Sequence, residues 1–155
     1  YAPGAISSDT VVYGESTVKA ALDGLTNQVN ALVTNQAVRF LSFATTPPQD
    51  SEVIGMYIVD AQMTYSDNFV ESQVAVQTPP DATYVFTIVK YTSGVATTIG
   101  NITVTPTGEI TRAAVAGTLS IGDVVSVVGS PTPDASIAGF VLDLVFRIAS
   151  SVTSG

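Results

Sequence analysis

The chain has no cysteine, no histidine and no tryptophan among its 155 residues. Without cysteine there is no disulfide and no thiol nucleophile. Without histidine as well, Ser-His and Cys-His nucleophile pairs and the ordinary zinc sites are excluded. Glycine-rich phosphate loops are also missing, since the glycines are scattered at turn spacing. We therefore expect a protein that is not an enzyme, with no catalytic residue, no cofactor and no metal site.

Charge is scarce too, because only 12% of the residues are charged while 46% are apolar. Five basic residues against thirteen acidic ones leave a net charge of −8, and the basic residues form no cluster. Nucleic acid and anionic membranes are therefore not expected partners. The most apolar stretch, 124–142, is interrupted by Pro131, Pro133 and Asp134, so we expect no membrane span. A surface of Thr, Ser, Asn and Gln is common on extracellular and virion proteins.

One segment has the period of an amphipathic helix. Five apolar residues recur at spacings of 4, 3, 4 and 3, which places them on one stripe: Val18, Leu22, Leu25, Val29 and Leu32. Ser16 is the expected N-cap, and we assign 16–36 to this helix. An isolated helix of this length is marginal in water, so the stripe needs a partner surface. Two interpretations stay open, namely packing on the chain's own β domain and a coiled coil between parallel copies.

After Gln36 the period changes to two, and turn residues recur every eight to twelve positions. The predicted strands are 38–43, 55–64, 71–77, 83–91, 95–105, 109–115, 123–128 and 137–148. This pattern indicates a mostly β fold, an antiparallel β-sandwich of about eight strands with jelly-roll or immunoglobulin-like topology. The expected organisation is an extended N-terminal attachment segment (1–15), the coiled-coil helix (16–36), the β-sandwich domain (37–149) and a C-terminal tail (150–155).

Two strands are apolar on both faces, 124–128 and 140–146. A central position in a large sandwich explains one such strand. Two of them in one small domain also fit a subunit interface.

The candidate functional side chains are few. The densest carboxylate cluster is Asp60, Asp67 and Glu71, which flanks a turn and is best explained as solvated turn acids. Calcium at Asp81, Asp123 or Asp134 is not expected, because no run supplies alternating oxygen ligands. Tyrosines at strand ends can hold sugars on exposed aromatic faces, although core packing is the default for each. The candidate receptor contacts are Tyr57, Tyr65, Tyr84 and Tyr91.

Two stretches resemble bacteriophage virion proteins. Residues 7–25 (SSDTVVYGESTVKAALDGL) are similar to a segment of phage fibre proteins with a Thr-Val-x-x-Ala-Leu-x-x-Leu helix start. Residues 68–148 are similar to a small β-sandwich at the outer end of tail-fibre and head-fibre proteins. The matching features are Asn68-Phe69 with Ser72, Phe86-Thr87-Ile88 with Lys90, Ile99-Gly100-Asn101-Ile102, Gly122-Asp123, Pro133-Asp134 and the final apolar strand. The sequence departs from the family's Lys-Asn-Gly hairpin at 90–94, where a longer loop is expected.

The resemblance implies a homotrimeric fibre or spike subunit on the virion surface. The five stripe residues would then form a trimeric coiled coil, residues 1–15 would bind other virion proteins, and the sandwich would attach to a host-surface glycan. Three alternatives remain: a capsid decoration or head-fibre protein with a mainly structural role, a bacterial secreted carbohydrate-binding or adhesin module, and a depolymerase that uses Asp60, Asp67 and Glu71.

Overall fold

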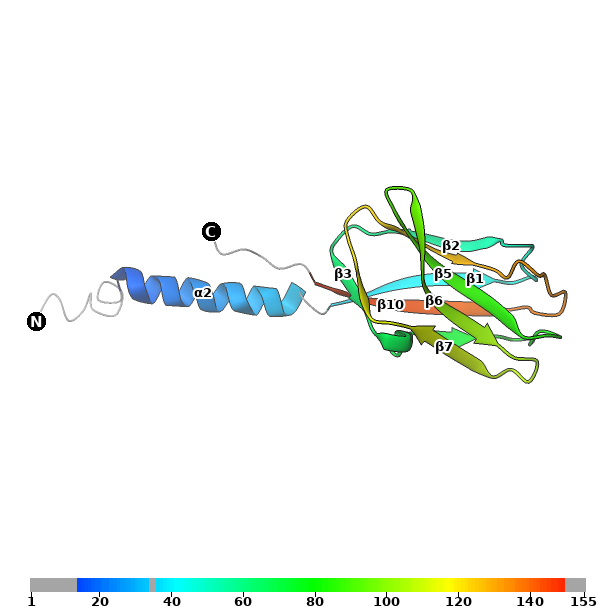
Figure 1. Cartoon of the computed structure of the whole chain (residues 1–155). Coiled ribbons are helices and arrows are strands. Elements are labelled where there is room, and N and C mark those ends of the chain that lie inside the picture. Colours follow the sequence, from blue (N-terminus) through cyan, green and yellow to red (C-terminus); the bar gives the residue numbers. More distant parts are fainter. Residues whose placement is uncertain (1–13, 34–35, 150–155) are drawn as a thin grey trace, which may run out of the picture.

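The computed structural model describes residues 14–33 and 36–149. Two antiparallel sheets pack face to face, and one helix projects from one end of this β-sandwich (Figure 1). The predicted fold class, a mostly β sandwich preceded by a short helix, is confirmed. The predicted C-terminal tail and all but the last two residues of the predicted attachment segment (1–15) lie outside the described residues.

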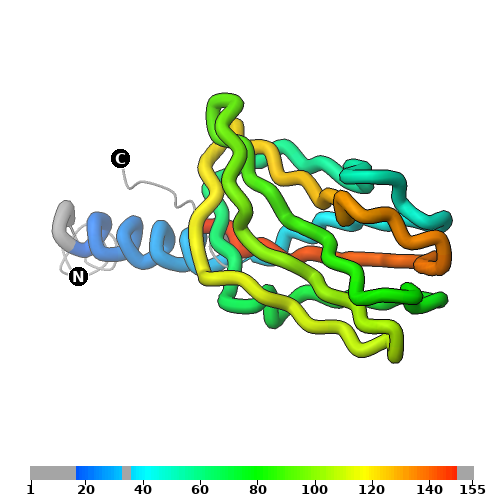
Figure 2. The backbone as a smooth tube through the Cα atoms, turned by 45° about the vertical axis from the view of Figure 1, so that its right-hand side comes forward, coloured from blue at the N-terminus to red at the C-terminus, as the bar shows by residue number. Residues whose placement is uncertain are grey.

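The chain crosses repeatedly between the two sheets. Sheet A has the order β1-β10-β3-β8, with β4 also paired to β10, and sheet B has the order β2-β9-β5-β6-β7. In Figure 2 the first and last strands, cyan and red, lie side by side in sheet A. The helix and strands are α2 (Gly14–Val33), β1 (Ala37–Ala44), β2 (Val53–Ile58), β3 (Met63–Tyr65), β4 (Gln73–Ala75), β5 (Tyr84–Thr92), β6 (Val95–Val104), β7 (Ile110–Ala114), β8 (Gly117–Leu119), β9 (Val124–Val128) and β10 (Phe140–Ile148), with a 3-10 turn, η2, at Asp67–Phe69.

Alternate residues of the strands fill the space between the sheets. Phe86 of β5 stacks on Phe140 of β10 with ring centroids 3.7 Å apart, and both rings are buried. Each fully buried side chain of this size contributes about 1.5–3 kcal/mol relative to an exposed one. This core explains why a chain without cysteine can fold.

The two strands that are apolar on both faces are central strands. β9 lies between β2 and β5, and β10 lies between β1 on one side and β3 and β4 on the other. Val125 and Val127 of β9 face the core and are fully buried, whereas Val124 and Val128 are half-buried on the outer face. Central placement therefore explains both strands without requiring a subunit interface.

The described residues form ten strands rather than about eight. The predicted strand 55–64 is wrong as one unit, because it forms β2 in sheet B and β3 in sheet A with a corner between them. The corner is held by two backbone hydrogen bonds, from Val59 N to Asp123 O and from Gly122 N to Val59 O, both 2.9 Å. The three-residue strand β8 was not predicted.

The hairpin at 90–94 is also tighter than expected. β5 and β6 stay paired through Thr92 and Val95, so only Ser93 and Gly94 form the turn. Both turn residues have positive φ, 50° and 81°, which is the geometry of a type I′ turn and suits glycine at the second position. The expected longer loop at 90–94 is therefore wrong, because the strands stay paired up to a two-residue turn.

The helix begins at Gly14 rather than at Ser16, so the predicted N-cap lies inside the first turn, and it ends at Val33 rather than at Gln36. It points away from the end of the sandwich at which β1 begins (Figure 1). Lys19 and Asp23, one turn apart, form an exposed ion pair of 2.8 Å on its surface. Such a pair contributes only about 0.3–0.5 kcal/mol, so helix formation must draw on other contacts.

Candidate interaction surfaces

The apolar stripe of α2 is exposed to solvent within a single chain. The exposed fractions are 52% for Val18, 58% for Leu22, 57% for Leu25 and 67% for Leu32. These values exclude the interpretation that the stripe packs on the chain's own sandwich. A projecting helix with an uncovered row of leucines is typical of a surface that another chain covers.

The spacing of the stripe is that of a coiled-coil seam. Residues at spacings of 4, 3, 4 and 3 occupy alternating a and d positions, and Val29, half-buried, lies in the same row. Asn27 lies about 200° around the helix from Leu25, on the opposite face, and no large apolar residue accompanies it there. The seam is therefore narrow, as expected for a small parallel bundle rather than for a helix lying on a sheet.

A second apolar surface covers the outer side of sheet B. The strand register places Met56, Ser126 and Val89 in one row and Ile58, Val124 and Tyr91 in the next. A groove of about 360 Å³ runs along these rows under the β5–β6 turn. Its lining residues are Val53, Met56, Tyr91, Ser93, Gly94, Gly122, Val124 and Ser126. An aromatic ring with nearby hydroxyl groups in an open groove is a suitable place for a sugar ring.

Tyr91 is the only one of the four candidate tyrosines in this groove. Tyr65 and Tyr84 are buried, with 9% and 1% exposure, so their prediction as receptor contacts is wrong. Burial raises the pKa of both hydroxyls. The Tyr84 hydroxyl oxygen also accepts a hydrogen bond from Ser130 N at 3.0 Å.

Tyr57 packs edge-to-face against Phe40 with ring centroids 5.7 Å apart, and its hydroxyl donates to Asp60 at 3.2 Å. Burial, followed by the nearby Asp60 carboxylate, raises the pKa of this hydroxyl. Its ring therefore packs against other aromatic side chains of the same chain, Phe40 and Phe146.

The three acids of the turn cluster each have a separate structural partner. Asp60 accepts from the Tyr57 hydroxyl, and Asp67 Oδ1 accepts from the backbone N–H of Ala116 at 2.7 Å. Glu71 forms a two-pronged ion pair with Arg147, with a shortest contact of 2.7 Å. The hydrogen bond from Arg147 lowers the pKa of Glu71. None of these contacts brings two of the carboxylates together, so the geometry does not favour a glycosidase pair.

Residues that carry the resemblance also have structural roles. Asn68 Oδ1 accepts from Ala114 N at 3.2 Å, and Ser72 Oγ accepts from Val145 N at 2.9 Å. Arg112 donates to the backbone carbonyls of Phe69 and Ser72. The segment 67–72 therefore joins sheet B to sheet A.

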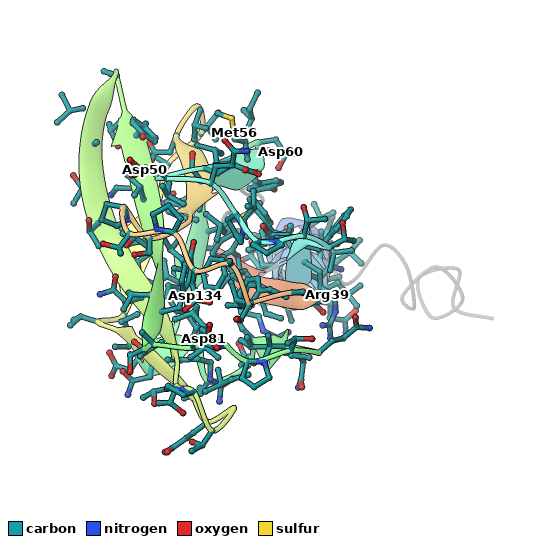
Figure 3. All side chains as sticks on the ribbon, turned by 90° about the vertical axis from the view of Figure 1, so that its right-hand side faces the viewer. Arg39, Asp50, Met56, Asp60, Asp81 and Asp134 are labelled. Atoms are coloured by element: carbon teal, nitrogen blue, oxygen red, sulfur yellow. The ribbon has the colours of Figure 1, made fainter. Side chains whose placement is uncertain are left out.

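The end of the sandwich farthest from α2 is acidic. Its loops, 45–52, 76–83, 105–109 and 129–139, carry no lysine or arginine and five acidic residues: Asp50, Glu52, Asp81, Glu109 and Asp134. Figure 3 looks onto this end and labels Asp50, Asp81 and Asp134. Asp134 joins two of these loops, since its carboxylate accepts from the backbone N–H groups of Asp81, Ala82 and Ser136 at 2.9–3.0 Å. Although burial opposes it, these bonds lower the pKa of Asp134. A tip of this charge disfavours polyanionic ligands.

Comparison with known proteins identifies no relative, since no protein-family description matches the chain and no curated protein matches it significantly. Within residues 14–33 and 36–149, no helix is long and apolar enough to cross a membrane. In the same residues, no three His, Cys, Asp or Glu side chains are grouped closely enough to hold a metal ion.

Sequence reasoning did not single out the groove on sheet B or the outer face of β1. Residues 38–43 were predicted as a strand, but both of its sides carry apolar residues, Phe40 on one and Leu41 and Phe43 on the other. A strand that is apolar on both sides and lies at the edge of a sheet would have indicated an uncovered apolar face. That signal requires knowing that β1 is an edge strand, and strand order is a property of the fold.

Proposed function

We propose that this chain is a structural virion protein of a bacteriophage, a fibre or spike subunit in which α2 associates three copies and the sandwich is presented at the far end. The observation that carries this proposal is the exposed stripe on a helix that projects from the domain. The resemblance of residues 7–25 and 68–148 to phage fibre proteins supports the number three and the virion setting.

The function of such an arrangement is multivalent attachment. Three weak sites on one stalk bind a surface with greater avidity than one site, because the second and third contacts form at a high effective concentration. Tyr91 and the groove on sheet B are the recognition site that the geometry favours. The net charge of −8 makes a neutral host-surface glycan a better candidate than a phosphate-rich one.

The test is binding of the fluorescently labelled chain to an array of bacterial capsular, cell-wall and lipopolysaccharide glycans. We expect the wild type to bind, Tyr91→Ala to lose binding, and Leu25→Asp to bind roughly 10²–10⁴-fold more weakly by loss of avidity. Ile121→Ala, a surface change outside the groove, is the matched control and should bind as the wild type does.

Two results would overturn attachment as the function. Binding by Leu25→Asp as tight as that of the wild type would show that multivalency plays no part. Absence of binding to every glycan would leave the capsid decoration or head-fibre role as the better explanation. Hydrolysis of any polysaccharide on the array, measured as a fall in its viscosity, would contradict a non-enzymatic role.

A further inference from the structure

A third uncovered apolar surface lies on the outer side of sheet A, along the half of β1 that leads toward the acidic end of the sandwich. Leu41 and Phe43 of β1 are 61% and 56% exposed, and Val141 of β10 is 40% exposed. The register places Phe43 opposite Val141, and Val141 opposite Ala75 of β4. These residues form an apolar row across three strands, and we call Leu41, Phe43 and Val141 the β1 face.

Charges beside the β1 face cancel. Arg39 pairs with Asp143 at 2.6 Å, and Arg147 pairs with Glu71 at 2.7 Å. Two of the five basic residues of a chain with net charge −8 are thus used to neutralise this side. Copies of an acidic chain repel one another less where acids are paired with bases, as Asp143 and Glu71 are. Figure 3 shows Arg39 on a different side of the sandwich from Met56, which borders the groove.

The position of β1 relates this face to the helix. β1 begins at Ala37, and only three residues separate it from the end of α2 at Val33. β1 is also an edge strand of sheet A, and it continues roughly along the direction of the helix (Figure 1). A bundle of α2 helices would therefore hold the β1 strands of its members close to the bundle axis, where like residues of different copies meet.

We propose that the β1 face is a contact surface between copies of this chain, and that it continues the α2 seam into the sandwich. This inference rests on the proposed association through α2 and adds the sandwich residues that take part. Tethering by α2 raises the effective concentration of neighbouring sandwiches to the millimolar range, so a small apolar contact suffices. The groove on sheet B remains free for a ligand.

The absence of cysteine allows a direct test by crosslinking. A single cysteine is introduced at Phe43, and the full chain is treated with a short bis-maleimide. The matched control is Val115→Cys, because Val115 is 81% exposed and lies next to β7, at the opposite edge of sheet B from β2. We expect Phe43→Cys to crosslink at least roughly tenfold faster than the control at micromolar protein, at a rate that does not change on dilution.

The two parts of the account can fail separately. The first case is a wild type with the mass of a multimer in which Phe43→Cys crosslinks no faster than Val115→Cys. The β1 face is then not a contact between copies, whereas association through α2 stands. If Leu25→Asp does not slow crosslinking at Phe43, the sandwiches associate without the helix and the proposed stalk is wrong. Slow crosslinking at both positions in a monomeric wild type overturns both proposals.

Discussion

Leu25→Asp is the substitution that separates assembly from folding most cleanly. Leu25 is 57% exposed in one chain, and its stripe makes no part of the sandwich core. Burying a leucine side chain completely contributes about 1.5–3 kcal/mol, so covering the part still exposed contributes about 1–1.5 kcal/mol per chain. In a trimer the substitution removes about 3–4.5 kcal/mol in total, which corresponds to two to three orders of magnitude in the association constant.

The introduced carboxylate weakens the assembly further. Three aspartates would lie in one apolar seam without basic partners, and an unpaired buried charge costs several kcal/mol. In the isolated chain the same change costs no more than about 0.7 kcal/mol of helix propensity, because the position is exposed. We therefore expect Leu25→Asp to be a monomer at micromolar concentration, with the sandwich folded as in the wild type.

The assay is sedimentation velocity combined with circular dichroism on melting. Asn27→Asp is the matched control, since it adds the same charge on the opposite face of α2. A Leu25→Asp protein that sediments as the wild-type assembly would refute the reasoning. Equal dissociation by Asn27→Asp would also refute it, because net charge rather than the seam would then be responsible.

Three further predictions concern the sandwich. A Cβ at Gly55 would lie 2.5 Å from Ser42 Oγ, so we expect Gly55→Ala to lower the free energy of unfolding in urea by about 1–3 kcal/mol; an unchanged midpoint would show that the sheets can separate there. The buried hydroxyl of Ser42 has no hydrogen-bond partner among the described residues, so Ser42→Ala should leave the stability unchanged or raise it by up to about 1 kcal/mol. A loss of stability would show that the hydroxyl has a partner. Asp134 has a lowered pKa in the folded chain, so its contribution is complete above about pH 4 and is lost as the pH falls through the folded value. Melting temperatures of Asp134→Asn should therefore depend less on pH than those of the wild type below about pH 4, and parallel curves would contradict this.

Periodic features were predictable from the sequence, whereas features made by distant contacts were not. The spacing of Val18, Leu22 and Leu25 locates α2 to within a few residues, because helix period is a local property. The two-residue period locates most strands for the same reason. The corner between β2 and β3 was missed, since its backbone partner Asp123 is more than sixty residues away in the sequence.

The candidate site shows the same division. Tyr84 and Tyr91 look alike in sequence, as both lie at strand ends. Tyr84 is buried against Phe86, whereas Tyr91 lines the groove on sheet B. The pairing of β5 with β9 brings Tyr91 beside Val124 in that groove. The exposed side of β1 was equally undetermined, because Phe40 and Leu41 are both apolar and only the sheet order shows which one faces the core.

The measurement that tests the central claim most directly is the molar mass of the full chain by sedimentation equilibrium across the micromolar range. The account predicts three times the mass of one chain, with dissociation only on strong dilution. The mass of a single chain throughout that range would contradict association through α2.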